Sequence, residues 1–494
     1  MAAFCYACVM ESGAGSARVT QGPTHPHDSH SMTETLKTLS PVDGRIYAER
    51  PLDTPADIDR ALDAARAAQI AWSATPLEER CAVLGRAVDA FVAKTQEIAV
   101  EITWQMGRPI RHAPGEVRGF EERARYMLAV APEALAAIRP GEKTGFARQI
   151  KRVPLGVVAV VAPWNYPYLT AVNAVMPALI AGNAVVLKHS HQTPLCAERF
   201  HEAFARAGVP AGVFQYLHLS HADTARLVGD ARVASVCFTG SVPGGRAIVA
   251  ATARGFATSG LELGGKDPAY VRADADLKQA IETLTDGAFY NAGQSCCGIK
   301  RIYVAAPRYK DFVDGVVELA KQYRLGSPLD ADTTLGPVVR TAAADAVRAQ
   351  VRDGIARGAS QLIDETGFPA SAAGTPYLAP QVLIGVNHSM AIMREETFGP
   401  AVGIMPVASD EEAVRLMNDS DFGLTAAIFS QDAARAEALG DALETGTVFL
   451  NRCDYLDPAL AWTGVKQSGR GCTLSRVGFE QLTRPKSYHF KVTM

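Results

Sequence analysis

The most informative part of the sequence is the stretch FYNAGQSCC over residues 289–297, read together with LELGGK over residues 261–266. The first stretch offers thiols beside a glycine-containing turn, and the second offers a carboxylate followed closely by two glycines. A soft nucleophile and a general base are what a protein needs to form and then hydrolyse a covalent acyl intermediate. Neither stretch is decisive alone, because a buried cysteine is usually just a small apolar residue.

The composition is that of an ordinary globular protein. The chain has 494 residues, 48% hydrophobic and 20% charged, which is enough for two or three domains. A net charge of −3 gives no reason to expect nucleic acid or a membrane as partner. The nine scattered cysteines form no disulfide framework, which favours a cytoplasmic location. No apolar run approaches the ~18 residues that a membrane helix needs.

Residues 1–31 differ from the rest of the chain. Histidines stand there among Pro, Ser and Asp, which predicts a disordered extension. Cys5 and Cys8 could supply half a zinc site, but no second Cys or His pair follows at zinc spacing, so no metal is expected. A basic leader with a sustained apolar segment is also missing, so we expect no signal peptide.

Helical and strand-like segments alternate along the remaining chain. Apolar residues recur at helical spacing over residues 58–66, 78–100 and 117–135. The alternation predicts an α/β fold with parallel sheets in two Rossmann-like lobes and the chemistry in the cleft between them. The segments that we expect to be strands are 153–161, 183–187, 235–238, 268–271, 301–304, 401–405 and 447–450.

The two opening stretches closely resemble the signature motifs of the aldehyde dehydrogenase superfamily, and further motifs fit from about Leu39 to the C-terminus. The resemblance implies an NAD(P)-binding domain, a catalytic domain and a small β arm that joins subunits into a homodimer or homotetramer. The sequence near 146–151 and 488–492 alternates as the strands of such an arm would, although a local surface hairpin is the alternative. The implied boundaries are 32–138 and 157–264 for the cofactor domain, 265–470 for the catalytic domain, and 139–156 with 471–494 for the arm.

The resemblance also assigns the catalytic roles. Cys296 occupies the position of the family's nucleophile. Its neighbour Cys297 carries the same thiol group, and only the alignment with the family motif favours Cys296 over it. Asn165, within PWNYP over residues 163–167, matches the donor that stabilises the oxyanion. Glu262 matches the base that activates water, and relatives that transfer the acyl group to coenzyme A generally lack it. The presence of all three residues, Cys296, Asn165 and Glu262, also argues against a non-catalytic scaffold protein.

Cofactor contacts follow from the same register and imply NAD, with NADP possible. Lys188 matches a lysine that binds the adenosine ribose, and His191 stands where an acidic ribose ligand is frequent. Without an acidic residue at this position, the negative 2′-phosphate of NADP is not repelled, so NADP is a possible cofactor as well as NAD. The residues expected to contact the cofactor are Trp164, Lys188, His191, Gly240, Ser241, Glu396 and Phe398.

Two departures concern the surroundings of the base. Where the family commonly carries a lysine and a glutamate in a polar relay behind the base, this chain has Ala174 and Thr473. A buried charge without its partner costs several kcal/mol. The absence of both the lysine and the glutamate therefore leaves no unpaired charge behind the base. A proton leaving Glu262 then needs water or Thr473.

The register further outlines a substrate pocket with aromatic walls, which favours neutral medium-chain or aromatic aldehydes. Aminoaldehydes are the second interpretation, since aromatic faces attract cations and Asp454 adds a possible negative charge. No arginine stands where the family's semialdehyde enzymes bind a distal carboxylate, which argues against an anionic substrate. The residues expected in the pocket are Phe120, Tyr166, Asn173, Tyr290, Asp454, Leu456 and Trp462.

Overall fold

The computed structural model describes residues 34–493. The predicted N-terminal extension and its Cys5–Cys8 pair therefore lie outside the described residues. The described chain opens with an antiparallel hairpin of β1 (Thr35–Leu39) and β2 (Ile46–Pro51). Within residues 34–493, every helix is too short or too polar to cross a membrane.

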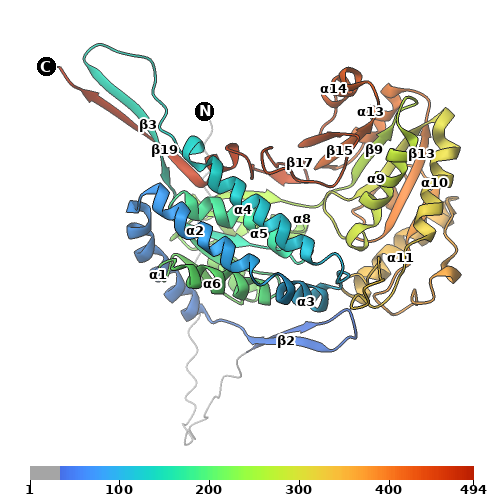
Figure 1. Ribbon diagram of the computed structural model, residues 1–494, viewed down its shortest axis with the longest axis horizontal. Coiled ribbons are helices and arrows are strands. Elements are labelled where there is room, and N and C mark those ends of the chain that lie inside the picture. Colours follow the sequence, from blue (N-terminus) through green and yellow to red (C-terminus); the bar gives the residue numbers. More distant parts are fainter. Residues whose placement is uncertain (1–33, 494) are drawn as a thin grey trace, which may run out of the picture. The chain divides into compact units, whose positions relative to one another are not determined.

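Four helices follow this hairpin along the chain (Figure 1). The first helix begins at a capping box, in which Thr54 and Asp57 each bind the backbone N–H of the other. The stretch 78–100, predicted as one helical segment, contains two helices because the chain turns after residue 92. The helices are α1 (Pro55–Ala74), α2 (Leu77–Val92), α3 (Thr95–Met106) and α4 (Pro114–Ala134).

The first large sheet has six strands in the order β18-β8-β7-β4-β5-β6, all parallel except β18. Its strands are β4 (Val157–Val161), β5 (Ala184–Lys188), β6 (Phe214–Tyr216), β7 (Val233–Thr239), β8 (Thr258–Glu262) and β18 (Gly469–Arg470). The connecting helices are α5 (Pro167–Ile180), α6 (Leu195–Ala207), α7 (His221–Val228) and α8 (Val242–Thr252). Parallel strands need such crossovers, so both faces of the sheet are covered.

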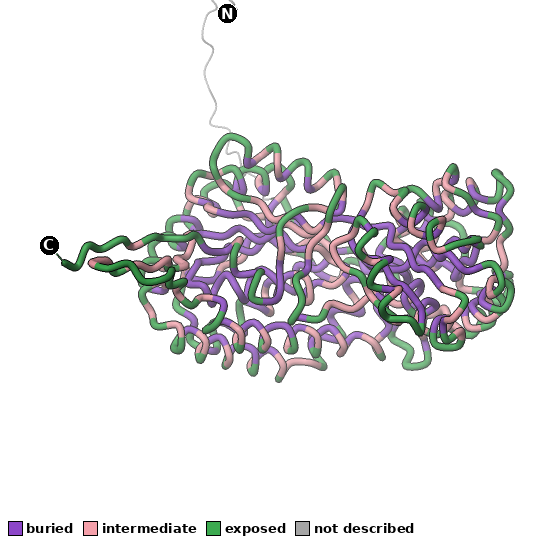
Figure 2. Tube along the Cα trace, turned by 90° about the horizontal axis from the view of Figure 1, so that it is seen from above, coloured by how far each residue is buried: buried purple, intermediate pink, exposed green. Residues whose placement is uncertain are grey.

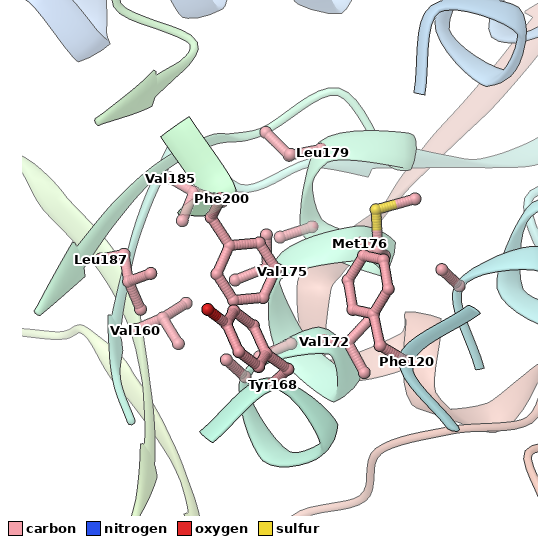
Figure 3. Packing of buried hydrophobic residues seen from close by; sticks show 14 of the residues in the cluster. Phe120, Val160, Tyr168, Val172, Val175, Met176, Leu179, Val185, Leu187 and Phe200 are labelled. Atoms are coloured by element: carbon pink, nitrogen blue, oxygen red, sulfur yellow. The ribbon is translucent and has the colours of Figure 1, made fainter. Parts of the chain in front are cut away.

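Successive residues of β4 face two different cores. Val158 and Val160 pack into the cluster that holds α2, α4, α5 and α6, whereas Ala159 packs toward α1, α7 and α8. Figure 3 shows the first core from close by, with the rings of Phe120 and Phe200 among the aliphatic side chains of α5 and the sheet. This packing fixes α4 and α5 against each other.

The second large sheet has seven strands in the order β11-β12-β13-β10-β9-β15-β16, and only β11 runs antiparallel to its neighbour. Helices α9 and α10 cover one face, and α11 to α14 pack on the other. The strands are β9 (Asp267–Val271), β10 (Ile299–Ala305), β11 (Ser360–Gln361), β12 (Gln381–Ile384), β13 (Ala401–Val407), β15 (Thr425–Phe429) and β16 (Thr447–Leu450). The helices are α9 (Leu277–Phe289), α10 (Tyr309–Lys321), α11 (Thr341–Ala356), α12 (Ala391–Arg394), α13 (Asp410–Asn418) and α14 (Ala433–Gly440). Two parallel α/β layers confirm the predicted fold class.

A separate two-stranded ribbon pairs β3 (Phe146–Pro154) with β19 (Thr483–Lys491) in antiparallel register. The two strands run side by side to the C-terminal end (Figure 1), and their outer part is largely exposed (Figure 2). The run predicted as one strand over 153–161 is divided between β3 and β4. A short pair of β14 (Phe422–Gly423) and β17 (Val465–Lys466) completes the strands. The predicted domain boundaries stay predictions.

Candidate active site

Cys296 lies on a tightly bound loop between α9 and β10. The loop contains Asn291 and Ala292, both at a φ of 54°, a left-handed conformation that non-glycine residues rarely adopt. Arg108 Nε donates to Asn291 Oδ1 at 3.0 Å, and the Val339 N–H donates to Gln294 Oε1 at 2.7 Å. These bonds compensate for backbone strain and set the direction of the loop.

The two adjacent cysteines have different surroundings. Cys296 is half-buried and lies on the wall of a cavity, whereas Cys297 is buried and donates its Sγ–H to Asp454 Oδ1 at 2.9 Å. Hydrogen bonding to Cys296 and burial raise the pKa of Cys297 well above its ordinary value. A thiol held protonated is a poor nucleophile, so Cys296 is the better placed of the two.

Asn165 lies buried just before α5, beside the nucleophile loop. Its side-chain Nδ2 donates to the Gln294 carbonyl at 3.1 Å, two residues before Cys296. Its own carbonyl accepts from Arg108 Nη2 at 2.6 Å. The amide is therefore held in a fixed orientation with one N–H left for a further acceptor.

Glu262 ends β8 and points its carboxylate at two threonines. Thr473 Oγ donates to Oε1 at 2.6 Å, and Thr239 Oγ donates to Oε2 at 2.9 Å. Burial raises the pKa of Glu262, while the two hydroxyls and the charge of Arg123 oppose that rise. A carboxyl with a raised pKa is a better proton acceptor than an ordinary surface glutamate.

Cys296 and Glu262 open onto one cavity of about 350 Å³. Six of the seven residues predicted for the substrate pocket line it: Tyr166, Asn173, Tyr290, Asp454, Leu456 and Trp462. Phe120, the seventh, instead packs in the core with its ring 4.2 Å from that of Phe91 and only 2% exposed. The helical period explains the difference, because the cavity-lining residues of α4 recur three to four positions apart and leave Phe120 on another face: Gly115, Glu116, Arg118, Gly119, Glu122 and Arg123.

Three arginines that were not expected in the pocket line this cavity: Arg108, Arg118 and Arg123. Arg108 is fully buried and forms an ion pair with Glu116. Arg118 is exposed, and Arg123 is buried, with its Nη1 donating to the carbonyl of Leu169 at 2.5 Å. The positions of Arg118 and Arg123 on α4 could have indicated a polar helix face, but the sequence does not show which face meets the cavity.

Asp454 is a weaker candidate for a free negative charge than expected. Its Oδ1 accepts hydrogen bonds from Ser295 Oγ and Cys297 Sγ, both at 2.9 Å. Burial raises its pKa. We therefore assign it to holding the nucleophile loop in place.

The residues predicted for the cofactor surround the ends of β5, β7 and β8. Lys188 ends β5, and its Nζ has no hydrogen-bond or ion-pair partner among the residues that the structure describes. Burial lowers its pKa to about 8. A buried donor without a partner is unfavourable in the protein alone, and ribose hydroxyls would satisfy it. Lys188 is therefore compatible with a dinucleotide at the end of β5.

Other cofactor residues are arranged around this lysine and the glycines. Ser241 caps α8 by accepting from the N–H of Gly244, and Gly240 precedes it at the helix N-terminus, where phosphate groups bind well. His191 binds the carbonyl of Leu219 through Nε2 at 2.6 Å, which leaves only Nδ1 for a ligand.

On the opposite side, Glu396 accepts from the N–H of Gly265 at 3.3 Å. A Cβ at Gly264 would lie 2.3 Å from the Glu396 carboxylate, so the glycine is required for this approach. Trp164 and Phe398 meet edge to face with ring centroids 5.6 Å apart. The predicted residues thus form two groups, one around Lys188 and one around Glu396.

Known proteins of similar sequence identify the family of the chain. A model of the aldehyde dehydrogenase family matches residues 27–488. The succinate semialdehyde dehydrogenase (NAD(P)+) of Escherichia coli is 34% identical over 90% of this chain and 95% of its own length. A betaine aldehyde dehydrogenase of Cereibacter sphaeroides is 35% identical over 92% and 93% of the two chains. The 3,6-anhydro-alpha-L-galactose dehydrogenase of Streptomyces coelicolor is 35% identical over 97% of each.

Solved structures agree with the sequence relatives. The succinic semialdehyde dehydrogenase from Streptococcus pyogenes, in complex with NADP+, matches with a TM-score of 0.88 and 31% identity over 92% of this chain and 100% of that chain. These matches extend over nearly the whole chain and include the segments that carry Cys296, Glu262 and Asn165. The chain belongs to the aldehyde dehydrogenase family, whose members oxidise aldehydes with NAD or NADP.

Proposed function

We propose that the protein oxidises an aldehyde and releases the product as a free carboxylic acid, with Cys296 as nucleophile and Glu262 as general base. The supporting observation is that both side chains line one cavity, with Glu262 held by two threonine hydroxyls. In a transfer to coenzyme A, a base that activates water would have no role. The pairing of a thiol with a base therefore favours hydrolysis.

The chain's own groups supply each step around the reacting carbon. The Cys296 thiolate adds to the aldehyde, and Asn165 Nδ2 together with the backbone N–H of Cys296 binds the resulting oxyanion. When NAD or NADP is bound, its nicotinamide ring accepts the hydride from that carbon. Glu262 then takes a proton from water, which attacks the thioester on Cys296 and releases the acid.

A small cavity behind Glu262 offers the proton a way out. It measures about 20 Å³ and is lined by Ala174 and Thr473 among others, the two positions that depart from the family pattern. That volume holds about one water molecule. We propose that this water and the Thr473 hydroxyl replace the charged relay.

We propose NAD as the preferred cofactor, with measurable use of NADP. Lys188 can bind ribose hydroxyls or offset the charge of a 2′-phosphate. His191 brings no negative charge that would repel such a phosphate.

The substrate is proposed to have a medium-sized aliphatic or aromatic skeleton, since Tyr166, Tyr290 and Trp462 line the cavity. Aminoaldehydes rank second, because the raised pKa of Asp454 weakens its use as a cation partner. The named relatives act on differently charged aldehydes, so their names favour no class.

For assembly, we propose a homodimer or homotetramer joined partly through the β3–β19 ribbon, whose edges leave backbone groups for another chain to bind. The cytoplasmic location stays a prediction.

An aldehyde panel tests the proposed activity. Hexanal, benzaldehyde and 4-aminobutanal are each incubated with NAD or NADP, and the reduced cofactor and the acid product are both quantified. We expect one acid per reduced cofactor without any added thiol acceptor. Formation of product only in the presence of coenzyme A would refute the hydrolytic route.

A further inference from the structure

The wall of the substrate cavity contains a buried cation without a carboxylate partner. Arg123, on α4, is only 8% exposed. Its Nη1 donates to the carbonyl of Leu169 at 2.5 Å and to Asn173 Oδ1 at 3.2 Å. Its Nε and Nη2 have no hydrogen-bond partner within residues 34–493, although the side chain lines the cavity. Two donors of a planar fork are therefore available on the cavity side.

Asn173, on α5, adds a second unpartnered donor beside Arg123. Its side chain is 1% exposed and also lines the cavity. Its Oδ1 accepts from Arg123, whereas its Nδ2 lies beyond hydrogen-bond distance of every described partner, with the Glu262 carboxylate near enough for the Asn173 amide to lower the pKa of that group. Leaving a buried amide N–H without a partner is unfavourable, so a ligand that accepts from it is stabilised.

Arg108, a second arginine that lines the cavity, is fully paired and serves as a comparison for Arg123. Arg108 forms an ion pair with Glu116 and donates to two further oxygens, of Asn165 and Asn291. Arg123 has no equivalent pair, and burial lowers its pKa. Burying an unpaired guanidinium costs several kcal/mol. Retaining one in a cavity wall is explained when a ligand brings the missing anion.

The carboxylates near Arg123 do not fill this role. Each oxygen of Glu262 accepts one hydrogen bond from a threonine hydroxyl, and Glu262 acts on Arg123 through its charge without a hydrogen bond between the two side chains. Glu116 is committed to Arg108 and to the backbone N–H groups of Tyr168 and Leu169. Within the described chain, no carboxylate hydrogen-bonds Arg123, and its side chain lines the cavity that the substrate would enter.

We propose that Arg123 and Asn173 form a subsite for a carboxylate of the substrate, so that the preferred aldehydes carry a second, anionic oxygen group. A carboxylate accepts two parallel hydrogen bonds from a guanidinium fork and a third from an amide N–H. The inference rests on the proposed function and refines it, because the expectation of a neutral substrate depended on the pocket lacking an arginine. The proposed substrate is still an aldehyde of medium size, but it carries a negative charge instead of being neutral.

Matched acid and ester pairs test the subsite in the wild-type enzyme. Succinic semialdehyde is compared with methyl 4-oxobutanoate, and 4-carboxybenzaldehyde with its methyl ester. We expect kcat/KM to be about 10- to 100-fold higher for the acid of at least one pair, the range for hydrogen bonds to a charged group. Benzoate should also inhibit benzaldehyde oxidation competitively.

Variants locate the effect. Arg123→Met keeps the length of the side chain and should lower kcat/KM for the preferred acid about 10- to 100-fold, mainly by raising KM. At a pH where Glu262 is ionised in both enzymes, so that loss of the Arg123 charge does not change its protonation, the ester should be oxidised at close to its wild-type rate. Asn173→Ala should lower the acid's kcat/KM less and in the same direction. Arg118→Met is the matched control, because Arg118 lines the same cavity but is exposed.

The outcomes separate the two proposals. Equal or better turnover of the ester by the wild type overturns the subsite, whether or not the variants fold. A uniform fall for acid and ester in Arg123→Met also overturns it and assigns Arg123 to holding Glu262. An effect of Arg118→Met as large as that of Arg123→Met would place the anion at the mouth instead. Oxidation of no aldehyde at all would overturn the proposed function and this inference with it.

Discussion

Replacing Thr473 by valine removes one of the two hydroxyl groups that donate hydrogen bonds to Glu262, the proposed general base. The shape of the side chain changes little. Thr473 is 6% exposed, and its Oγ donates to Glu262 Oε1 at 2.6 Å. Valine has nearly the same shape but cannot donate. The carboxylate form of Glu262 loses a hydrogen bond, and the protonated form loses much less, so the variant raises the pKa of Glu262 above its wild-type value.

The size of the effect follows from the strength of that bond. A hydrogen bond to a charged group is worth about 1.5–3 kcal/mol. Since each 1.36 kcal/mol changes an equilibrium tenfold, the fraction of ionised Glu262 on the acidic side of its titration falls about 10- to 100-fold. Deacylation should slow by that factor there. At pH values above both titrations, the two enzymes should deacylate at similar rates, because Glu262 is ionised in each.

Stopped-flow fluorescence of the reduced cofactor measures both half-reactions at a series of pH values. The burst reports thioester formation, which needs no general base, and the slower phase reports deacylation. We expect an unchanged burst amplitude and an ascending pH limb of deacylation displaced to higher pH. Thr463→Val is the matched control, because Thr463 lines the same small cavity but donates to the Gly471 carbonyl. An ascending limb that stays in place, or an equal displacement in the control, would refute the reasoning.

The remaining predictions concern the nucleophile, the base, the cofactor and assembly. Cys296→Ala should abolish turnover while Cys297→Ala retains most of it, in a steady-state assay that the reverse pattern would contradict. Glu262→Gln should give a burst near one equivalent per site and then little turnover, and a wild-type steady rate without a burst would exclude it as the base. His191→Glu should lower kcat/KM for NADP more than for NAD, and equal losses would show that His191 does not face the ribose. Sedimentation at micromolar concentration should show a dimer or tetramer, unchanged by deletion of residues 1–31, and a monomer would contradict the proposed ribbon contact.

The fold could be predicted well because its signals are local. Strands such as Ala184–Lys188 are continuous apolar runs, and they are buried on both faces as parallel strands require. The errors were also local. The single helix expected over 78–100 is broken after residue 92, and the strand expected over 153–161 is divided around Leu155–Gly156. Apolar periodicity continues through such breaks, so the pattern alone does not reveal where the chain turns.

The pocket could be predicted less well, because its walls depend on how α4 and α5 lie against each other. Phe120 was placed by register, yet it packs in the core because the cavity-lining positions of α4 are 115, 116, 118, 119, 122 and 123, which recur at helical spacing and leave 120 on another face. Arg123 was missed for the same reason. An arginine on a charged helix is normally solvated, and nothing in the sequence marks this one as buried.

Arg123 and Asn173 carry information as a pair that neither carries alone. They lie on different helices, and Arg123 Nη1 donates to Asn173 Oδ1 at 3.2 Å. The small polar side chain of Asn173 leaves room for the guanidinium and supplies an acceptor for it. Read singly, Asn173 was only one of the residues expected in the pocket. The contact between the two helices makes this part of the wall polar, and the proposed substrate charge rests on that contact and not on the motifs.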